Sequence, residues 1–178
     1  GIMVTETLAV NTLLIQALML VSYFLDGFCF AAETYAGKFY GQGDRSGLST
    51  LATVGGGLSV GLGVGFAIAF ISFPQSLFGL LTDHQTVLSQ LDGYVLWLLP
   101  VFSFGAIAFM LDGYFLGLTS GRVLRNSTVL ATLVGFVPLA IVAYVRESPH
   151  GLWLALTCFM AIRALTLGWA VPSSFKSA

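Results

Sequence analysis

The chain has 178 residues, of which 57% are hydrophobic and only 8% charged, and its net charge is −1. Soluble domains carry roughly 25% charged residues, so this composition indicates an integral membrane protein. The near-neutral charge gives no basic surface for nucleic acid. Apolar runs of about twenty residues, without alternation of apolar and polar positions, favour an all-α bundle of transmembrane helices over a β-barrel.

Five spanning helices are predicted in chain order, at about residues 8–40, 48–73, 86–119, 126–145 and 151–171. The first is longer than a bilayer requires and must tilt or protrude. A proline removes one backbone donor, so we expect Pro100 to kink the third helix and Pro138 the fourth. Pro172 is expected to end the fifth.

The second span carries Gly57, Gly61 and Gly65, which form two overlapping GxxxG units. Small residues at this spacing allow another helix to approach closely. We therefore predict that these glycines form a packing face. The alternative is a helix that must flex or slide during a transport cycle.

Basic residues predict the orientation of the bundle, because cytoplasmic loops are enriched in Lys and Arg. Six of the seven basic residues are assigned to one side, and only Arg146 to the other. The six are Lys38, Arg45, Arg122, Arg125, Arg163 and Lys176. This count predicts a cytoplasmic C-terminus. The odd number of spans and the start at Gly1 indicate a piece of a longer protein with at least one preceding helix.

Acidic residues within the apolar runs are the main candidates for function. Asp26 and Glu33 lie about two helical turns apart and share a helix face. The pattern around Asp26, aromatic-x-Leu-Asp-Gly-aromatic, recurs at Asp112 in the third span. A carboxylate in the bilayer costs about 3 kcal/mol, so such residues usually serve a function.

Counting back from Lys38 and Arg122 places Asp26 and Asp112 within about 3 Å of the same depth, so they are expected to face one cavity and bind a coupling ion there. Glu33 would lie nearer the cytoplasmic mouth. The structural alternative is that both aspartates hydrogen-bond to neighbouring helices and that Glu33 pairs with Lys38.

Polar and aromatic residues in the spans are weaker candidates for substrate binding. Aromatic faces attract cations, and polar side chains orient a ligand. The candidates are Asn11, Gln16, Tyr23, Phe28 and Tyr114, with Phe30 and Phe109 completing an aromatic wall. The alternatives are interhelical hydrogen bonds for the amides and core or lipid contacts for the aromatics. Trp97, Trp153 and Trp169 are expected to anchor span ends at the membrane interface.

Several segments, in order, resemble the C-terminal half of MATE (multidrug and toxic compound extrusion) transporters, specifically the DinF branch. The matching segments are LAVN (8–11), YFLDGF (23–28), AAE (31–33), GQGD (41–44), LDG (111–113), RNS (125–127) and LWLALT (152–157). The resemblance implies twelve helices in two six-helix lobes and export of organic cations or amphipathic compounds in exchange for protons or sodium. It implies no other cofactor.

On this pattern the chain resembles helices eight to twelve, a partial C-terminal lobe without the N-terminal lobe and the first helix of its own lobe. These missing parts, membrane lipid and a small-molecule substrate would be its partners, in the plasma membrane (the bacterial inner membrane). Asp112 matches the acid of the C-lobe cation site in the NorM branch. Asp26 and Glu33 match acids typical of the DinF branch.

The functional hypothesis is a secondary antiporter. One alternative is a lipid-carrier flippase of the same broader superfamily, which would need cationic residues for pyrophosphate, and the predicted spans contain none between their loops. The other is a structural bundle fragment without independent activity. An intramembrane enzyme is not expected, because neither His84 nor His150 lies at membrane depth. Cys29 and Cys158 lie in apolar runs, where a free thiol behaves as a small hydrophobic group, so we expect no disulfide and no metal site.

Overall fold

The computed structural model describes residues 2–81 and 91–175, and within these ranges it is helical and contains no strand. The predicted start of the third span lies outside these residues, as do His84 and Lys176, so their expected positions are not described. The helices are α1 (Ile2–Gly41), α2 (Arg45–Thr50), the π-helical η1 (Leu51–Gly55), α3 (Gly56–Ser72), α4 (Pro74–Phe78), the 3-10 turns η2 (Leu91–Gly93) and η3 (Val95–Trp97), α6 (Leu98–Gly117), α7 (Gly121–Leu130), the π-helical η4 (Ala131–Phe136), α8 (Val137–Val145) and α9 (Pro149–Ser174).

Several of these segments follow one another without a break and form longer rods. Among the described residues, five rods are long and apolar enough to cross a membrane, which confirms the predicted number. They are Leu8–Gly41, Arg45–Ser72, Val95–Gly117, Gly121–Val145 and Pro149–Ser174. Among them, α1 is 40 residues long, which corresponds to about 60 Å at 1.5 Å per residue. Because this exceeds the bilayer core, α1 must tilt or protrude, as its sequence predicts.

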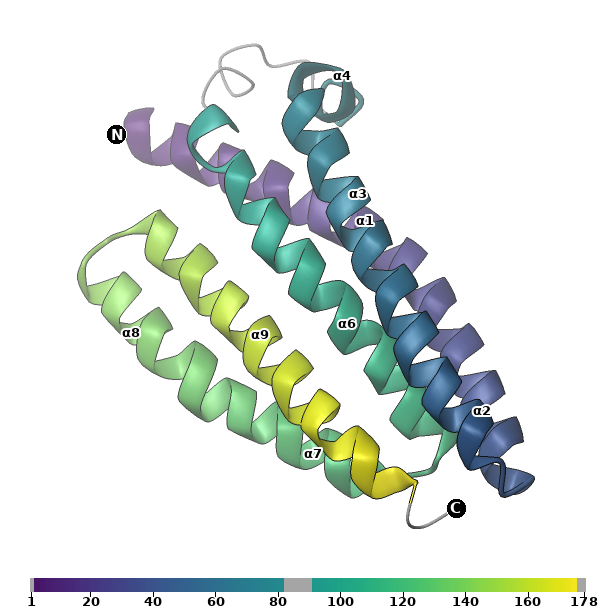
Figure 1. Cartoon of the computed structure of the whole chain (residues 1–178). Helices are drawn as coiled ribbons and strands as arrows, with labels where there is room; N and C mark the ends of the chain where they lie inside the picture. Colours follow the sequence, from purple (N-terminus) through teal and green to yellow (C-terminus); the bar gives the residue numbers. More distant parts are fainter. Residues whose placement is uncertain (1, 82–90, 176–178) are drawn as a thin grey trace.

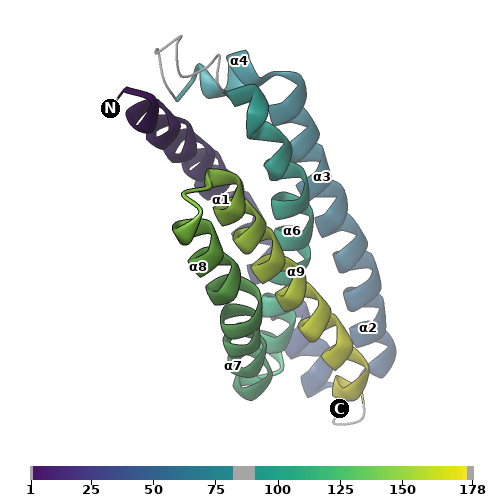
Figure 2. The ribbon, with the colours of Figure 1, turned by 90° about the vertical axis from the view of Figure 1, so that its left-hand side faces the viewer.

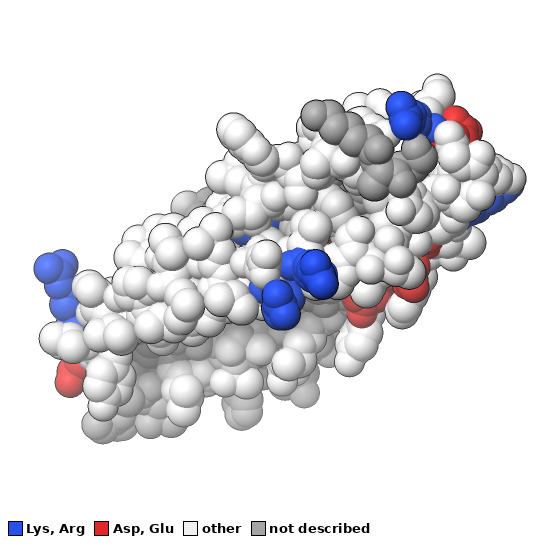
Figure 3. All heavy atoms as spheres, turned by 90° about the horizontal axis from the view of Figure 1, so that it is seen from below, with Lys and Arg blue, Asp and Glu red and all other residues white. Residues whose placement is uncertain are grey.

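The rods run alternately up and down. Figures 1 and 2 show the α1–α2 turn, the α6–α7 turn and the C-terminal end of α9 at one end of the bundle, with the start of α1, α4 and the α8–α9 turn at the other. Most of the surface seen in Figure 3 is neither acidic nor basic. Such a surface suits contact with lipid.

Helix α6 is the centre of the bundle, because it contacts α1, α3 and α9. Half of the residues in its most apolar stretch are buried inside the bundle, against a third or less in each of the other spans. Two hydrophobic cores pack on it at different depths. The upper core includes Leu14, Val21, Leu25, Phe102, Ala106 and Trp153; the lower core includes Ala32, Ala36, Met110, Leu111, Tyr114 and Leu167.

Glycines of α6 bring α1 into close contact. A Cβ atom on Gly113 would collide with the carbonyl oxygen of Cys29, and one on Gly117 with that of Glu33. The two contacts lie one helical turn apart on both helices. Only a residue without a side chain permits this approach, so the Gly of the second Leu-Asp-Gly motif is a packing residue. In the first motif, Gly27 has no atom within 4 Å of an added Cβ.

The face by which α3 packs is not the predicted one. A Cβ on Gly57, Gly61 or Gly65 would meet nothing within 4 Å, so the predicted GxxxG face is open among the described residues. The face that contacts α6 consists of Gly55, Ser59, Gly63 and Ala67. These residues have the same spacing of four but are shifted by two positions, which turns them by about 200° around the helix. The prediction was wrong because two small-residue stripes share this span.

The prolines also differ from expectation. Pro100 is the third residue of α6, in the first turn, where its missing N–H costs no intrahelical bond, so the predicted kink is wrong. Pro172 lies inside α9, which continues to Ser174, so the predicted end there is wrong too. Pro138 is the second residue of α8, just after the π-helical η4, and the kink expected there stays a prediction.

The two stripes of α3 give a matched test of the packing. Gly63→Ala should lower the thermal midpoint of the full-length protein in detergent, because the added methyl group presses on the Phe102 carbonyl oxygen and lies 2.9 Å from Ala106 Cβ; overpacking of this kind costs about 1–3 kcal/mol. Gly61→Ala should leave the midpoint unchanged or raise it, since Ala favours the helix by up to about 1 kcal/mol. Equal effects would show that the packing face has been assigned wrongly.

Candidate functional site

An ion pair joins the third and fifth spans. Arg163 Nη2 of α9 donates to Asp112 Oδ1 and to Oδ2 of α6, both at 2.8 Å. Both side chains are largely buried, with relative exposures of 22% for Arg163 and 18% for Asp112. Pairing offsets the cost of placing each charge at membrane depth.

The position of Arg163 corrects two predictions. It lies near the middle of the 26-residue α9 rather than at its cytoplasmic end. Without Arg163 the basic residues are distributed five against one, which still favours the predicted orientation. The expectation that the spans contain no cation is wrong as well. The signal for this site in the sequence was an arginine far inside an apolar run. It was missed because the fifth helix was expected to end at Pro172, which placed Arg163 near its cytoplasmic end.

The backbone at Arg163 is held separately from its side chain. Ser127 Oγ of α7 donates to the Arg163 carbonyl oxygen at 3.5 Å and shares a 2.6 Å hydrogen bond with Thr166 Oγ1. Two neutral hydroxyl groups thus fix this turn of α9 against α7, while the guanidinium reaches the other way toward α6.

The acids of α1 lie near the same site. On α1, Asp26 and Glu33 lie about one turn on either side of Cys29, whose backbone contacts Gly113, the residue next to Asp112. Because Cys29 packs on Gly113, Asp26 and Asp112 differ in depth by two residues, or about 3 Å. This agrees with the depth predicted from the sequence. Among the described side chains, no ion pair joins Glu33 to Lys38.

These groups form a polar layer, defined here as Asp26, Cys29, Glu33, Asp112 and Arg163. On α1 the upper core ends at Leu25 and the lower core begins at Ala32, so Asp26 and Cys29 occupy the interval. On α9 Arg163 likewise lies between Trp153 and Leu167, which belong to different cores. On α1 Asp26 and Cys29 therefore separate the two cores, whereas Asp112 of α6 and Glu33 of α1 lie among residues of the lower core.

The predicted substrate residues do not gather at one place. Asn11 Oδ1 accepts a 2.8 Å hydrogen bond from Trp153 Nε1, which matches the interhelical alternative. Tyr114 is fully buried, and its hydroxyl bonds to Ser174 Oγ at 2.8 Å. Tyr23 is 74% exposed, and Gln16 is also exposed. Phe30 is exposed too, so the expected aromatic wall is not formed.

The tryptophans differ in role. Trp153 is buried in the upper core, so it does not anchor the membrane interface as predicted. Trp97 Nε1 donates to His150 Nδ1 at 3.1 Å, across the start of α6 and of α9. Trp169 is 90% exposed and is free to contact lipid.

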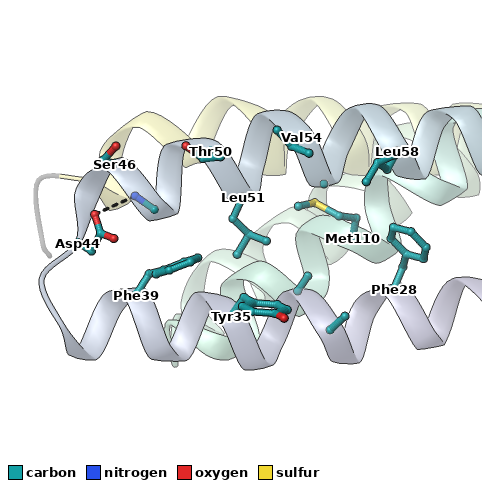
Figure 4. A pocket seen from close by; sticks show the side chains of 14 residues that line it. Phe28, Tyr35, Phe39, Asp44, Ser46, Thr50, Leu51, Val54, Leu58 and Met110 are labelled. Carbon is teal, nitrogen blue, oxygen red and sulfur yellow. Dashed lines mark hydrogen bonds between the residues drawn. The ribbon is translucent and has the colours of Figure 1, made fainter.

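Phe28 lines an apolar pocket that sequence reasoning missed. The pocket has a volume of about 550 Å³ and lies between α1 and the α2–η1–α3 rod, with Met110 of α6 at its base (Figure 4). One side of the pocket is aromatic and consists of Phe28, Tyr35 and Phe39. The opposite side is aliphatic and consists of Leu51, Val54 and Leu58. Its size falls within the usual range for small-molecule sites. The lining residues have no pattern in the sequence that separates them from lipid-facing ones.

The polar end of the pocket lies at the α1–α2 turn. Asp44 caps α2, because its Oδ1 accepts a 2.9 Å hydrogen bond from the Gly47 amide. Gly47 packs closely against Asp44 and Phe39, because a Cβ atom added to it would lie 2.6 Å from Asp44 Oδ2 and 2.6 Å from Phe39 Cδ1. The pocket thus combines an apolar body with one carboxylate at its end.

The role of Asn11 can be tested by a double-mutant cycle with Trp153. Asn11→Ala and Trp153→Phe should each lower thermal stability, and their effects should couple by about 0.5–1 kcal/mol, the range found for interhelical hydrogen bonds in membranes. Substrate affinity should not change. Gln16→Ala, an exposed amide on the same helix, is the control and should be neutral. Loss of substrate affinity in Asn11→Ala at normal stability would instead assign this side chain to the substrate site.

Comparison with known proteins gives a consistent result. The MatE family model matches residues 1–144. The chain is 33% identical over 165 residues to DNA damage-inducible protein F of Escherichia coli (strain K12), covering 92% of this chain and 35% of that protein. It is 30% identical over 171 residues to Protein DETOXIFICATION 44, chloroplastic, of Arabidopsis thaliana, covering 91% of this chain and 31% of that protein. No solved structure matches. The chain thus spans about a third of the length of these relatives.

Proposed function

We propose, since this chain belongs to the MatE family of membrane transporters, that it is part of a secondary antiporter that exports organic cations or other amphipathic compounds in exchange for protons or sodium ions. Members of this family are transporters rather than enzymes. The observation that carries the proposal is the polar layer, with Asp112 at its centre, inside an otherwise apolar bundle.

The polar layer supplies the chemistry that ion coupling needs. A carboxylate at membrane depth exists either ionised, with a bound cation or counter-ion, or protonated. Asp26 and Glu33 lie about one turn from Cys29, which contacts the turn of α6 that carries Asp112, so binding of a proton or sodium ion at one acid would change the electrostatic energy of the others. A coupling ion and a cationic substrate would compete for these negative charges, and this competition would exchange one for the other.

The rest of the parent protein completes the transporter in this proposal. The chain corresponds to a partial C-terminal lobe, consistent with its coverage of 35% of the bacterial relative. A facing lobe and the first helix of this lobe would close the cavity around the acids, and rocking of the lobes would give alternating access. The protein would lie in the bacterial inner membrane, with the end rich in basic residues on the cytoplasmic side.

The apolar pocket supports an amphipathic substrate. Its aromatic and aliphatic walls suit a hydrophobic body, and Asp44 at its end suits a positive charge. A lipid-carrier flippase is less well supported, because binding of pyrophosphate needs uncompensated positive charge. The charge of Arg163 is already neutralised by Asp112.

Neutralisation of Asp112 tests the proposal. In the full-length protein, Asp112→Asn should abolish ion-coupled efflux in cells and in proteoliposomes while membrane insertion persists, because the amide has no titratable proton and no negative charge to attract a sodium ion. Glu147→Gln is the matched control, since Glu147 is exposed in the α8–α9 turn outside the spans. Efflux that remains coupled in Asp112→Asn would remove this acid from the mechanism.

A further inference from the structure

Arg163 occupies the carboxylate on which ion coupling is proposed to depend. Its Nη2 atom lies 2.8 Å from each oxygen of Asp112. Both oxygens are therefore engaged by one cationic nitrogen. A sodium ion needs the same oxygens as ligands, and a proton must bind one of them. Each oxygen keeps a second lone pair, but the positive charge of Arg163 next to both oxygens opposes the binding of either ion while the pair is intact.

We propose that Arg163 is a tethered counter-ion, which neutralises Asp112 when no coupling ion is bound and must be displaced before one can bind. This inference rests on the proposed antiport function and adds to it a residue that regulates ion binding. In the unloaded state the pair has no net charge. Loading a proton or sodium ion leaves a positive charge on Arg163, which repels further cations and favours return to the pair.

The geometry of the contact supports a displaceable pair. A structural Arg–carboxylate pair commonly uses two nitrogens in a fork, which fixes its orientation. Here a single nitrogen makes both contacts, and Nε of Arg163 is buried with no hydrogen-bond partner among the described residues. An unsatisfied buried donor costs about 1–3 kcal/mol. The paired arrangement is therefore not the best possible one for the guanidinium.

The backbone can stay in place while the side chain moves. Ser127 and Thr166 hold the turn of α9 at Arg163 against α7 through hydroxyl groups. Displacement thus requires rotation about side-chain bonds only, which occurs much faster than movement of a helix. The close contact of Gly113 with Cys29 fixes the neighbouring turn of α6 at the same time.

The charged and titratable surroundings are defined on each neighbouring helix. From α1 the groups nearest this turn of α6 are Cys29, whose backbone contacts Gly113, and Asp26 and Glu33, about one turn to either side of it. From α6 comes Asp112 and from α9 Arg163, whereas the Tyr114 hydroxyl points to Ser174 and Cys158 packs against Gly135 of η4. From α7 the groups at this depth are neutral, because Arg122 and Arg125 lie at its exposed start.

The test measures ion binding by the full-length protein without substrate. Arg163→Gln removes the counter-ion, Arg163→Lys keeps a positive charge without the guanidinium, and Arg125→Gln is the matched control at an exposed site. Sodium binding is measured by calorimetry at fixed pH. In sodium-free buffer, proton binding is followed by the infrared carbonyl band of the Asp112 carboxyl group, identified by its loss in Asp112→Asn.

Arg163→Gln should raise the apparent affinity of Asp112 for the coupling ion roughly 10- to 1,000-fold, the effect expected when an opposite charge next to a carboxylate is lost. Arg163→Lys should give a smaller rise, because an ammonium group covers the carboxylate less well. Arg125→Gln should not change it. If Arg163→Gln does not accumulate in the membrane, Arg163→Lys decides: a higher affinity supports the inference, and an unchanged one overturns it.

A purely structural salt bridge predicts a different result. Both Arg163 variants would then unfold at lower temperature without any rise in ion affinity, and the inference would be wrong. Its failure can be separated from failure of the proposed function. If Asp112→Asn abolishes coupled efflux but neither Arg163 variant alters ion affinity, only the tethered counter-ion is refuted. If Asp112→Asn retains coupled efflux, the antiport role of Asp112 fails first.

Discussion

The close approach of α6 to its neighbours is the constraint on which the rest of the structure depends. Gly113 and Gly117 let the backbone of α1 contact that of α6 at Cys29 and Glu33, and Gly63 does the same for α3. In a bilayer, van der Waals packing of this kind replaces the hydrophobic effect as the force between helices. Because the contacts fix the relative depth of α1 and α6, they also fix the depth of the acids that each helix carries.

The polar layer explains why charge is tolerated in this position. On α6 Asp112 lies among residues of the lower core, between Leu111 and Tyr114, and its ion pair with Arg163 crosses from α6 to α9. Loss of one partner of a buried pair costs about 3–5 kcal/mol, so the two residues are expected to depend on each other. The same arrangement suits ion exchange, since a pair that is neutral overall can open when another cation arrives.

The sequence predicted the bundle well because hydropathy determines which segments span a membrane. It also predicted the similar depth of Asp26 and Asp112, since both positions follow from helix geometry and the repeated Leu-Asp-Gly motif. It did not predict which glycine stripe of α3 would pack, because Gly57 and Gly55 start stripes of equal spacing and only the partner helix decides between them. Arg163 was missed because it was assigned to the end of its helix, and the apolar pocket because it depends on contacts between distant segments.

The two π-helical segments have a consequence for sequence variation in this protein. A π turn contains one more residue than an α turn, and such turns occur mostly as single insertions within α-helices. Leu51–Gly55 and Ala131–Phe136 each interrupt a spanning rod in this way. Removal of a single residue from either segment would convert it to regular α-helix and keep the faces above and below it in their present directions. Elsewhere in these rods the same deletion would rotate every following side chain by about 100°.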